Sequence, residues 1–148
     1  MSMEEDKAIS RRFYDEVINH GHLAALDELL ASDCEGFKAA GAYGASNREH
    51  FKHLLAFALH TFPDCQHTIH AWHAEKDIVV TSFCLCGRQT GEYLGVPGVE
   101  KQFRATGSDT FHLVDGKIRE HWVDLDTLHL GRQIAAMVPL DVDSAYEV

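Results

Sequence analysis

The chain has 148 residues, an ordinary globular composition and a formal net charge of −10. This length predicts one domain that buries roughly 70% of its unfolded surface, and the acidic balance argues against nucleic acid, whose binding depends on cationic contacts to phosphate. No run approaches the roughly 18 apolar residues of a membrane helix, and the acidic start shows no secretory signal pattern. We therefore predict a cytoplasmic protein that binds neither nucleic acid nor membrane.

Three helices are predicted in the first part of the chain. Residues 4–19 and 22–30 repeat apolar side chains at helical spacing, and Ser46 or Asn47 can cap a third helix that ends near residue 62. The glycine-rich segment between the second and third helices predicts a loop with one short strand. The inward faces would consist of Ile9, Phe13, Val17 and Ile18, then Leu23, Leu26, Leu29 and Leu30, and last Phe51, Leu54, Leu55, Ala58 and Leu59.

From residue 65 onward the pattern changes to alternation, which is typical of strands. Residues 65–75 and 77–87 predict two strands around a turn at Lys76 and Asp77, and residues 102–126 predict a long hairpin that turns at Asp115-Gly116. Helices followed by a meander of about four strands indicate the α+β class. A curved antiparallel sheet wrapped around the N-terminal helices would enclose a cone-shaped, hydrophobic pocket, and ligand sites favour such concavities.

The end of the chain is predicted to hold one more helix. Asp126 would cap a helix from residue 127 to about residue 137, and an acidic tail follows at about residues 139–148.

Asp109 interrupts the alternation of the predicted hairpin. Phe103, Ala105, Gly107, Phe111 and Leu113 share one face of its first arm, and Asp109 is the single polar residue on that face. A carboxyl group on an apolar face is costly unless it is hydrogen-bonded or functional. Asp109 is therefore the strongest candidate for chemistry in this sequence.

The partner of Asp109 depends on the hairpin register. A two-residue turn at Asp115-Gly116 places Trp122 opposite Asp109, whereas a three-residue turn with a bulge at Gly116 places His121 there. We choose the second register, which also puts Val123 on the face of Asp109, and predict an Asp109–His121 acid/base pair.

The histidines and cysteines predict no metal site. His50 and His53 share a helix face, and on the next strand His67 and His73 would share one side while His70 takes the other. No acidic partner completes a set with metal-ligand spacing. The four cysteines lack zinc-ribbon spacing, and Cys84 and Cys86 would lie reduced on one side of a strand.

Six ordered motifs resemble the SnoaL-like polyketide cyclase (ester cyclase) family over almost the whole chain. They are Phe62-Pro63-Asp64; Ala74-Glu75-Lys76-Asp77; Thr90-Gly91-Glu92-Tyr93-Leu94-Gly95-Val96-Pro97; Gly107-Ser108-Asp109-Thr110-Phe111; Asp115-Gly116-Lys117-Ile118; and Glu120-His121-Trp122, with a final Asp126. The resemblance implies the cone-shaped fold shared with ketosteroid isomerase and nuclear transport factor 2, in a homodimer or homotetramer. It also implies intramolecular aldol cyclisation without metal or cofactor, in which an aspartate moves the proton.

The sequence departs from that family at the position of this aspartate. The residue after Trp122 is Val123, which cannot transfer a proton, and Asp124 would point to the opposite face of the strand. Gln89 stands where many members have a histidine. Ile18 and Leu54 match positions that tune stereochemistry in the cyclases, and both are apolar here.

Two main functions follow from these residues. The first is an enzyme of the lyase or isomerase type that cyclises or isomerises a small hydrophobic carbonyl compound, with Asp109 as acid or base, His121 as its partner and Gln89 as a hydrogen-bond donor. The second is a non-catalytic ligand-binding or assembly protein that has lost the usual aspartate. The pocket would be lined by Phe13, Ile18, Leu54, Gln89, Phe111 and Val123.

Epoxide hydrolysis is a third possibility on the same fold. It would need an Asp-Arg-Asp arrangement in the pocket, to which Arg88 or Arg119 could contribute with Asp109.

Overall fold

The computed structural model describes residues 2–38, 44–62, 64–88 and 102–125. Its elements follow one another as α1 (Met3–Arg12), η1 (Phe13–Ile18), η2 (Leu23–Ala25), α2 (Leu26–Leu29), β1 (Leu30–Lys38), α3 (Arg48–Thr61), β2 (Gln66–Glu75), β3 (Ile78–Arg88), β4 (Gln102–Val114) and β5 (Lys117–Leu125). The predicted α+β class is confirmed. Gln89, Asp126 and the predicted last helix and tail lie outside the described residues. Within them, no helix is long and apolar enough to cross a membrane.

The first helix changes its winding halfway along. Ser2 caps α1 by accepting a hydrogen bond from the Glu5 N–H, and η1 continues it as a π-helix in which the Asn19 N–H reaches back to the Tyr14 carbonyl. The sequence predicted one regular helix here. The wider turn places four of the six η1 side chains in the interior, namely Phe13, Tyr14, Val17 and Ile18.

The strand after the second helix is longer than predicted. Helix α2 ends at Leu29, and β1 begins at Leu30 and pairs in parallel with β5. Asn47 then caps α3 by accepting from the His50 N–H at 2.9 Å, as one of the two predicted caps. The parallel pairing of β1 makes the sheet mixed rather than purely antiparallel.

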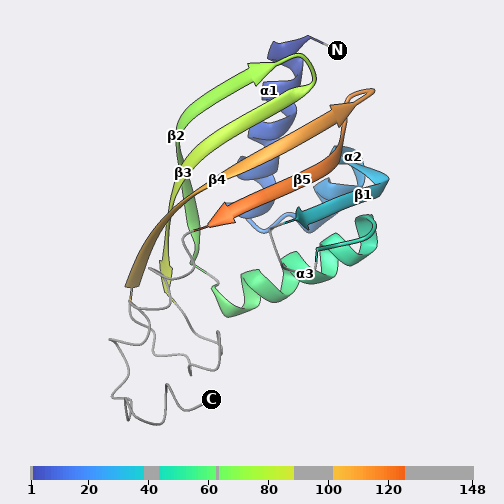
Figure 1. Cartoon of the computed structure of the whole chain (residues 1–148). Helices are drawn as coiled ribbons and strands as arrows, with labels where there is room; N and C mark the ends of the chain where they lie inside the picture. Colours follow the sequence, from blue (N-terminus) through green and yellow to red (C-terminus); the bar gives the residue numbers. More distant parts are fainter. Residues whose placement is uncertain (1, 39–43, 63, 89–101, 126–148) are drawn as a thin grey trace, which may run out of the picture.

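The sheet has the order β1-β5-β4-β3-β2 and is curved but not closed. In Figure 1, α1 and α3 cover the same face of the sheet, so the sheet and the helices form two layers. Between them lies the main core, which consists of Phe13, Tyr14, Val17, Ile18, Leu26, Leu29, Leu30, Cys34, Ala45, Phe51, Leu55, Val79, Phe111, Leu113 and Ile118. Burial of this apolar surface is the main stabilising contribution to the fold.

A bulge in β5 corrects the predicted hairpin register. Val114 pairs with Lys117 around a two-residue turn, and Asp115 and Gly116 both have positive φ there. The pairing then skips Arg119, since Leu113 pairs with Ile118 and His112 pairs with Glu120. The predicted three-residue turn, which placed His121 opposite Asp109, is therefore wrong.

A second bulge in β2 corrects the predicted histidine faces. Ile69 pairs with Phe83 and Ala71 pairs with Ser82, so that His70 is the extra residue. His67 lies before this bulge on the inner face, whereas His73 lies after it and is exposed. The prediction that His67 and His73 share one side is wrong, because a bulge reverses the alternation.

Gly36 allows α3 to approach β1 closely. A Cβ atom at Gly36 would lie 1.8 Å from a ring carbon of Phe51, and the rings of Phe51 and Phe37 stack with centroids 4.6 Å apart. Only glycine leaves room for this aromatic contact.

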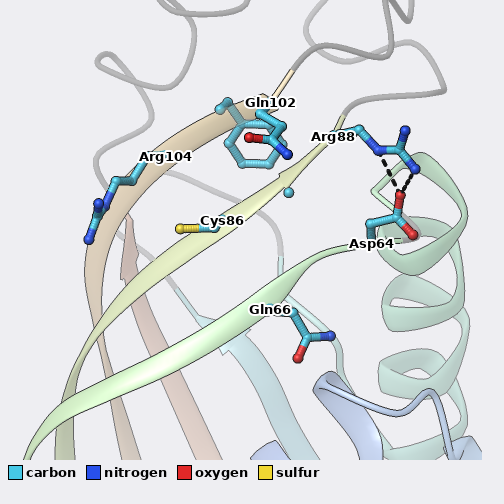
Figure 2. Close-up of a pocket in the computed structure, with 8 residues that line it drawn as sticks. Asp64, Gln66, Cys86, Arg88, Gln102 and Arg104 are labelled. Atoms are coloured by element: carbon cyan, nitrogen blue, oxygen red, sulfur yellow. Dashed lines mark hydrogen bonds and ion pairs between the residues drawn. The ribbon is translucent and has the colours of Figure 1, made fainter.

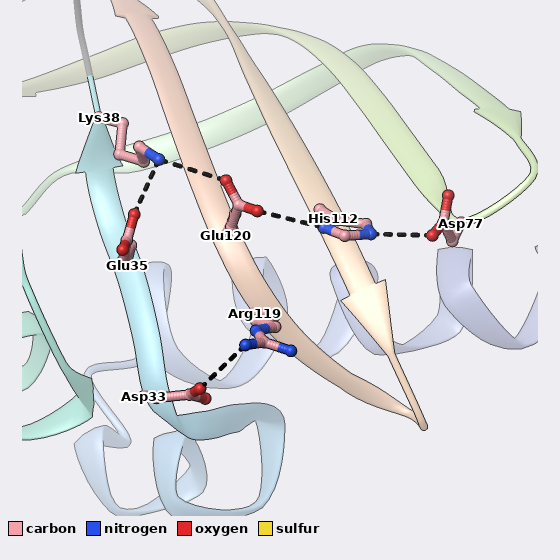
Figure 3. A network of polar contacts seen from close by, with 7 residues as sticks. All are labelled: Asp33, Glu35, Lys38, Asp77, His112, Arg119 and Glu120. Carbon is pink, nitrogen blue, oxygen red and sulfur yellow. Dashed lines mark hydrogen bonds and ion pairs between the residues drawn. The ribbon is translucent and has the colours of Figure 1, made fainter.

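The outer face of the sheet carries a chain of charged side chains (Figure 3). Lys38 lies between Glu35 and Glu120, with Nζ–O distances of 2.8 and 3.2 Å, and His112 connects Glu120 to Asp77. These pairs are partly exposed, so solvent screening limits what each contributes to stability.

Candidate functional site

A cavity of about 750 Å³ lies between the concave face of the sheet and helices η1 and α3. Most of its wall is apolar and consists of Phe13, Ile18, Phe37, Leu55, Ala58, Leu59, Phe62, Cys65, Phe83, Leu85, Phe103, Val123 and Leu125. Polar residues interrupt this wall, and among them Asp109, His121 and His67 face the helix layer. The lining is completed by Lys38, Ser108, Thr110, Trp122 and Asp124. An apolar cavity with a few converging polar groups is the usual form of a small-molecule site.

Asp109 is almost fully buried, and hydroxyl groups of the helix layer and of the neighbouring strand lie beside it. Its side chain accepts a hydrogen bond at Oδ2 from the hydroxyl of Tyr14 in η1. The Tyr14 hydroxyl also lies 2.6 Å from Oγ1 of Thr81, which pairs with Asp109 across β3 and β4. Burial, and then the negative charge of Asp109, raise the pKa of Tyr14 well above its ordinary value, so that the phenol stays protonated and keeps donating.

His121 holds the other oxygen of Asp109. Its Nε2 lies 2.9 Å from Oδ1 of Asp109, and its Nδ1 accepts a hydrogen bond of 3.1 Å from the backbone N–H of Phe37. Since Nδ1 is the acceptor, the ring proton lies on Nε2 and is donated to Asp109. His121 is thereby fixed as a neutral imidazole, and Asp109 receives hydrogen bonds at both oxygens.

The structure therefore brings the predicted Asp109–His121 pair together, although the predicted register is wrong. The bulge at Arg119 shifts the pairing by one residue, so that Asp109 faces Val123 directly and His121 faces Phe111. His121 and Val123 remain on the same face as Asp109, and His121 reaches Asp109 diagonally.

The predicted pocket residues divide into those that line the cavity and those that do not. Phe13, Ile18 and Val123 line it. Phe111 is fully buried in the core, with its ring 5.2 Å from that of His121, and Leu54 packs at the edge of the core. Neither belongs to the described wall of the cavity.

His67 is a cavity residue that the sequence analysis did not select as a site residue. It lies on the inner face of β2, with its ring 4.7 Å from that of Phe83 and 5.8 Å from that of Tyr14. Its Nδ1 is buried and has no hydrogen-bond partner among the described residues. Burial lowers the pKa of His67 to about 4, against the opposing influence of the nearby Asp109 charge. The imidazole is therefore neutral at pH 7.

Two further polar residues of the site were also missed. Thr81 is fully buried between Val79 and Phe83 on the inner face of β3, so it breaks the apolar alternation as Asp109 does. That interruption was a readable signal. Tyr14 stands three and four residues before Val17 and Ile18, so helical spacing places it beside their inward face, but that position alone does not single it out as a site residue.

A second, more polar pocket of about 610 Å³ lies where β2 and β4 begin and β3 ends (Figure 2). Arg88 forms a salt bridge there with Asp64, with a distance of 2.8 Å from Nε to Oδ2. Cys86 also lines this pocket, and its Sγ lies 3.9 Å from that of Cys84. The two thiols thus share one side of the strand, as predicted.

The arginines required for the epoxide hydrolase reading lie elsewhere. Arg119 pairs with Asp33, and Arg88 pairs with Asp64. Neither belongs to the described wall of the cavity around Asp109. Among the described residues, no group of three or more histidine, cysteine, aspartate or glutamate side chains could hold a metal ion.

Solved structures share this fold over nearly the whole chain. A SnoaL-like protein of Jannaschia sp. CCS1 superposes with a TM-score of 0.84 at 22% identity, covering 90% of this chain and 94% of that one. TsrD from Streptomyces laurentii gives 0.80 at 25% identity, covering 92% and 98%. IdmH from Streptomyces antibioticus, a proposed polyketide cyclase, gives 0.75 at 27% identity, covering 88% and 98%.

A comparison with curated proteins finds no match. The family model of the SnoaL-like polyketide cyclases, however, matches residues 8–134, which include every strand and helix around the cavity. The chain belongs to the SnoaL-like polyketide cyclase family.

Proposed function

We propose that the protein binds a small hydrophobic carbonyl compound in the cavity and cyclises or isomerises it by proton transfer, without a cofactor. The observation that carries this proposal is the cross-strand pairing of Asp109 with Val123. Directly opposed residues have Cβ atoms about 4.5–5.5 Å apart. A carboxyl group on residue 109 can therefore reach nearly the same point of the cavity as one on residue 123, where the family resemblance implies the catalytic aspartate.

In this mechanism Asp109 is the general base. It accepts a proton from the carbon next to the substrate carbonyl, and the electron pair of the C–H bond moves into an enolate. In a cyclisation the enolate carbon then attacks a second carbonyl of the same molecule, so that a C–C bond forms, and the new alkoxide takes up the proton from Asp109, which restores the carboxylate. In an isomerisation the proton returns to a different carbon.

The groups around Asp109 would orient its carboxylate. Each of its oxygens accepts one protein hydrogen bond, from Tyr14 or from His121, and retains a further acceptor site for a substrate proton. His121 would act as the partner of Asp109 by holding this geometry. The apolar wall supplied by Phe13, Ile18 and Val123 would bind the hydrocarbon part of the substrate.

Hydrogen–deuterium exchange of a simple ketone tests this proposal without knowledge of the natural substrate. β-Tetralone is a bicyclic hydrophobic ketone with acidic protons beside its carbonyl, and its exchange in D₂O can be followed by NMR. The protein should accelerate this exchange, and Asp109→Asn should lower the accelerated exchange rate by about 10²-fold or more. An acceleration that is equal in Asp109→Asn and in the native protein would exclude Asp109 as the base.

A cross-strand swap provides a sharper test of the carboxyl position. The double variant Asp109→Val/Val123→Asp returns a carboxyl group to the opposite strand at the same level of the sheet. It should recover part of the exchange activity that Asp109→Val alone loses. Val123→Ala is the matched control, since it changes the same position without adding a charge.

The second candidate function is a binding protein without catalysis. It is favoured by the hydrogen bonds that Asp109 already accepts at both oxygens, because these bonds satisfy the buried carboxylate within the protein without a substrate. A protein that binds β-tetralone in the cavity but does not accelerate its exchange would support this reading.

A further inference from the structure

His67 is the one inner-face histidine of the cavity whose ring forms no hydrogen bond with the described residues. The buried Nδ1 has no partner there, whereas both nitrogens of His121 are bonded. A buried polar atom without a partner is costly. The missing bond therefore indicates that the His67 ring is kept for contact with a ligand rather than bonded within the protein.

The backbone of His67 is held more firmly than its ring. The side-chain amide of Asn19 accepts from the His67 N–H at 2.8 Å and donates to the His67 carbonyl at 3.1 Å. Asn19 itself follows η1 and is bonded to the Tyr14 carbonyl through its N–H. This double hydrogen bond joins β2 to the end of η1, and it places the imidazole on the same side of the cavity as Tyr14.

We propose that His67 donates a hydrogen bond to the carbonyl oxygen of the bound ligand. Under the proposed function, on which this inference rests, the same bond would stabilise the negative charge that forms on that oxygen when Asp109 removes the neighbouring proton. His67 would then be a catalytic residue, and Asn19 would be a positioning residue that acts through it. No proton leaves the imidazole in this step, so the proton balance involves Asp109 and the substrate alone.

The surroundings of His67 favour a neutral donor over a cation. Phe83 and Tyr14 flank the ring, and the ionisable groups that face it are Asp109 and His121 in addition to Tyr14. Burial lowers its pKa to about 4, so that the neutral ring persists throughout the physiological range. A neutral imidazole carries one N–H and can polarise a carbonyl oxygen without giving up a proton.

The test uses the infrared carbonyl band of β-tetralone bound to the whole protein. A hydrogen bond lowers the C=O stretching frequency, so the bound ketone should absorb at lower frequency in the native protein than in His67→Phe. We expect this variant to weaken binding about three- to tenfold. His67→Gln, which restores an N–H donor, should recover part of the band shift, and His70→Phe is the matched control because His70 is exposed on the same strand.

The outcomes separate this inference from the proposed function. If the ketone binds and exchanges but its band is the same in the native protein and in His67→Phe, the role of His67 is refuted and the function of Asp109 stands. If the band shift depends on His67 but no exchange is accelerated, His67 is a ligand-binding residue and the catalytic proposal fails. If β-tetralone does not bind to the native protein, both proposals are overturned for this class of ligand.

Asn19 gives an independent check. Asn19→Ala removes both hydrogen bonds to the His67 backbone but leaves the imidazole in the chain. It should broaden the carbonyl band of the bound ketone, because the donor is less well fixed, and Asn19→Asp should restore only the bond from the His67 N–H. A carbonyl band that is unchanged in Asn19→Ala would exclude Asn19 as a positioning residue.

Discussion

The backbone N–H of Phe37 donates to Nδ1 of His121 over 3.1 Å, while Phe37 has a φ of 53°. Positive φ is unfavourable for a bulky residue, so the surrounding packing must hold Phe37 in this conformation. The strained residue fixes the ring of His121 with its proton on Nε2, toward Asp109. A long-range ¹H–¹⁵N NMR spectrum should therefore show the Nε2–H tautomer for His121, and a signal from the Nδ1–H tautomer would contradict the arrangement.

Removal of the His121 ring nitrogens should destabilise the protein. His121→Phe leaves Asp109 without its donor at Oδ1 and leaves the partly buried Phe37 N–H without a partner. We expect a loss of about 2–5 kcal/mol in the free energy of unfolding, measured by urea denaturation. His73→Phe changes an exposed histidine and should cost less than about 0.5 kcal/mol. Equal losses in the two variants would mean that the His121 hydrogen bonds contribute nothing.

Tyr14 and Thr81 should be energetically coupled through Asp109. The Tyr14 hydroxyl contacts both Thr81 Oγ1 and the Asp109 carboxylate, so Tyr14→Phe and Thr81→Val disturb one network. Each single change should cost about 1–3 kcal/mol, and the double variant should depart from additivity by about 0.5 kcal/mol or more. A double-mutant cycle by urea denaturation measures this coupling. Pairing Tyr14→Phe with Ser82→Ala, an exposed neighbour on β3, should give additive losses.

His67 should make the protein less stable as the solution becomes more acidic. Its pKa falls from an ordinary value of 6.5 to about 4 on folding, so the unfolded chain binds more protons between these values. The free energy of unfolding should decrease as pH falls through this window, by up to about 3 kcal/mol in total. His67→Phe should remove this part of the pH dependence and His73→Phe should not. Parallel stability curves for the native protein and His67→Phe would show that the imidazole is not buried in its neutral form.

A methyl group at Gly36 should disrupt the contact between β1 and α3. The Cβ atom of Gly36→Ala would lie 1.8 Å from Cδ2 and 2.0 Å from Cε2 of Phe51, and the ring cannot move without losing its stacking on Phe37. We expect a loss of about 2–4 kcal/mol on thermal or urea unfolding, as for an overpacked core. Ser32→Ala tests an exposed position of the same strand and should be nearly neutral. A mild effect of Gly36→Ala would mean that the Phe51 ring can shift to another position without losing its packing.

The buried thiols should resist alkylation. Burial raises the pKa of Cys34 and of Cys65 to about 12, so both stay protonated and poorly nucleophilic at pH 8. Iodoacetamide should label neither residue in the folded protein, as judged by peptide mass spectrometry, whereas urea should expose both. Rapid labelling of Cys34 without denaturant would show that β1 opens readily.

The sequence identified the site through one anomaly, and the same logic would have identified more of it. Asp109 was found because a carboxyl group interrupts an apolar face, and Thr81 interrupts the neighbouring strand in the same way at the paired position. Threonine is common in strands, so its interruption is a weaker signal than that of a carboxyl group. His67 gives no sequence signal for a cavity position, because the bulge at His70 separates it from the face of the later histidines.

The apolar periodicity of the sequence does not predict other parts of the fold. Alternation predicts which residues share a face only while the pairing is regular, and the bulges at His70 and Arg119 each shift it by one. The π-helical turn at Tyr14 and the parallel pairing of β1 depend on tertiary packing, for which the local sequence gives no pattern. The ends of the hairpin strands and the Asn47 cap were predictable, because turn and cap residues act locally.

The bulge at Arg119 also determines how the hairpin can change in evolution. With Arg119 outside the ladder, His121 faces Phe111 and Val123 faces Asp109, so loss of Arg119 would leave these pairs and their faces unchanged. If Arg119 instead entered the ladder opposite His112, every later side chain of β5 would move to the other side of the sheet, and Trp122 would take the place opposite Asp109. Relatives should accordingly be aligned in this hairpin by the direction of their side chains, since residue order alone would equate positions that face opposite ways.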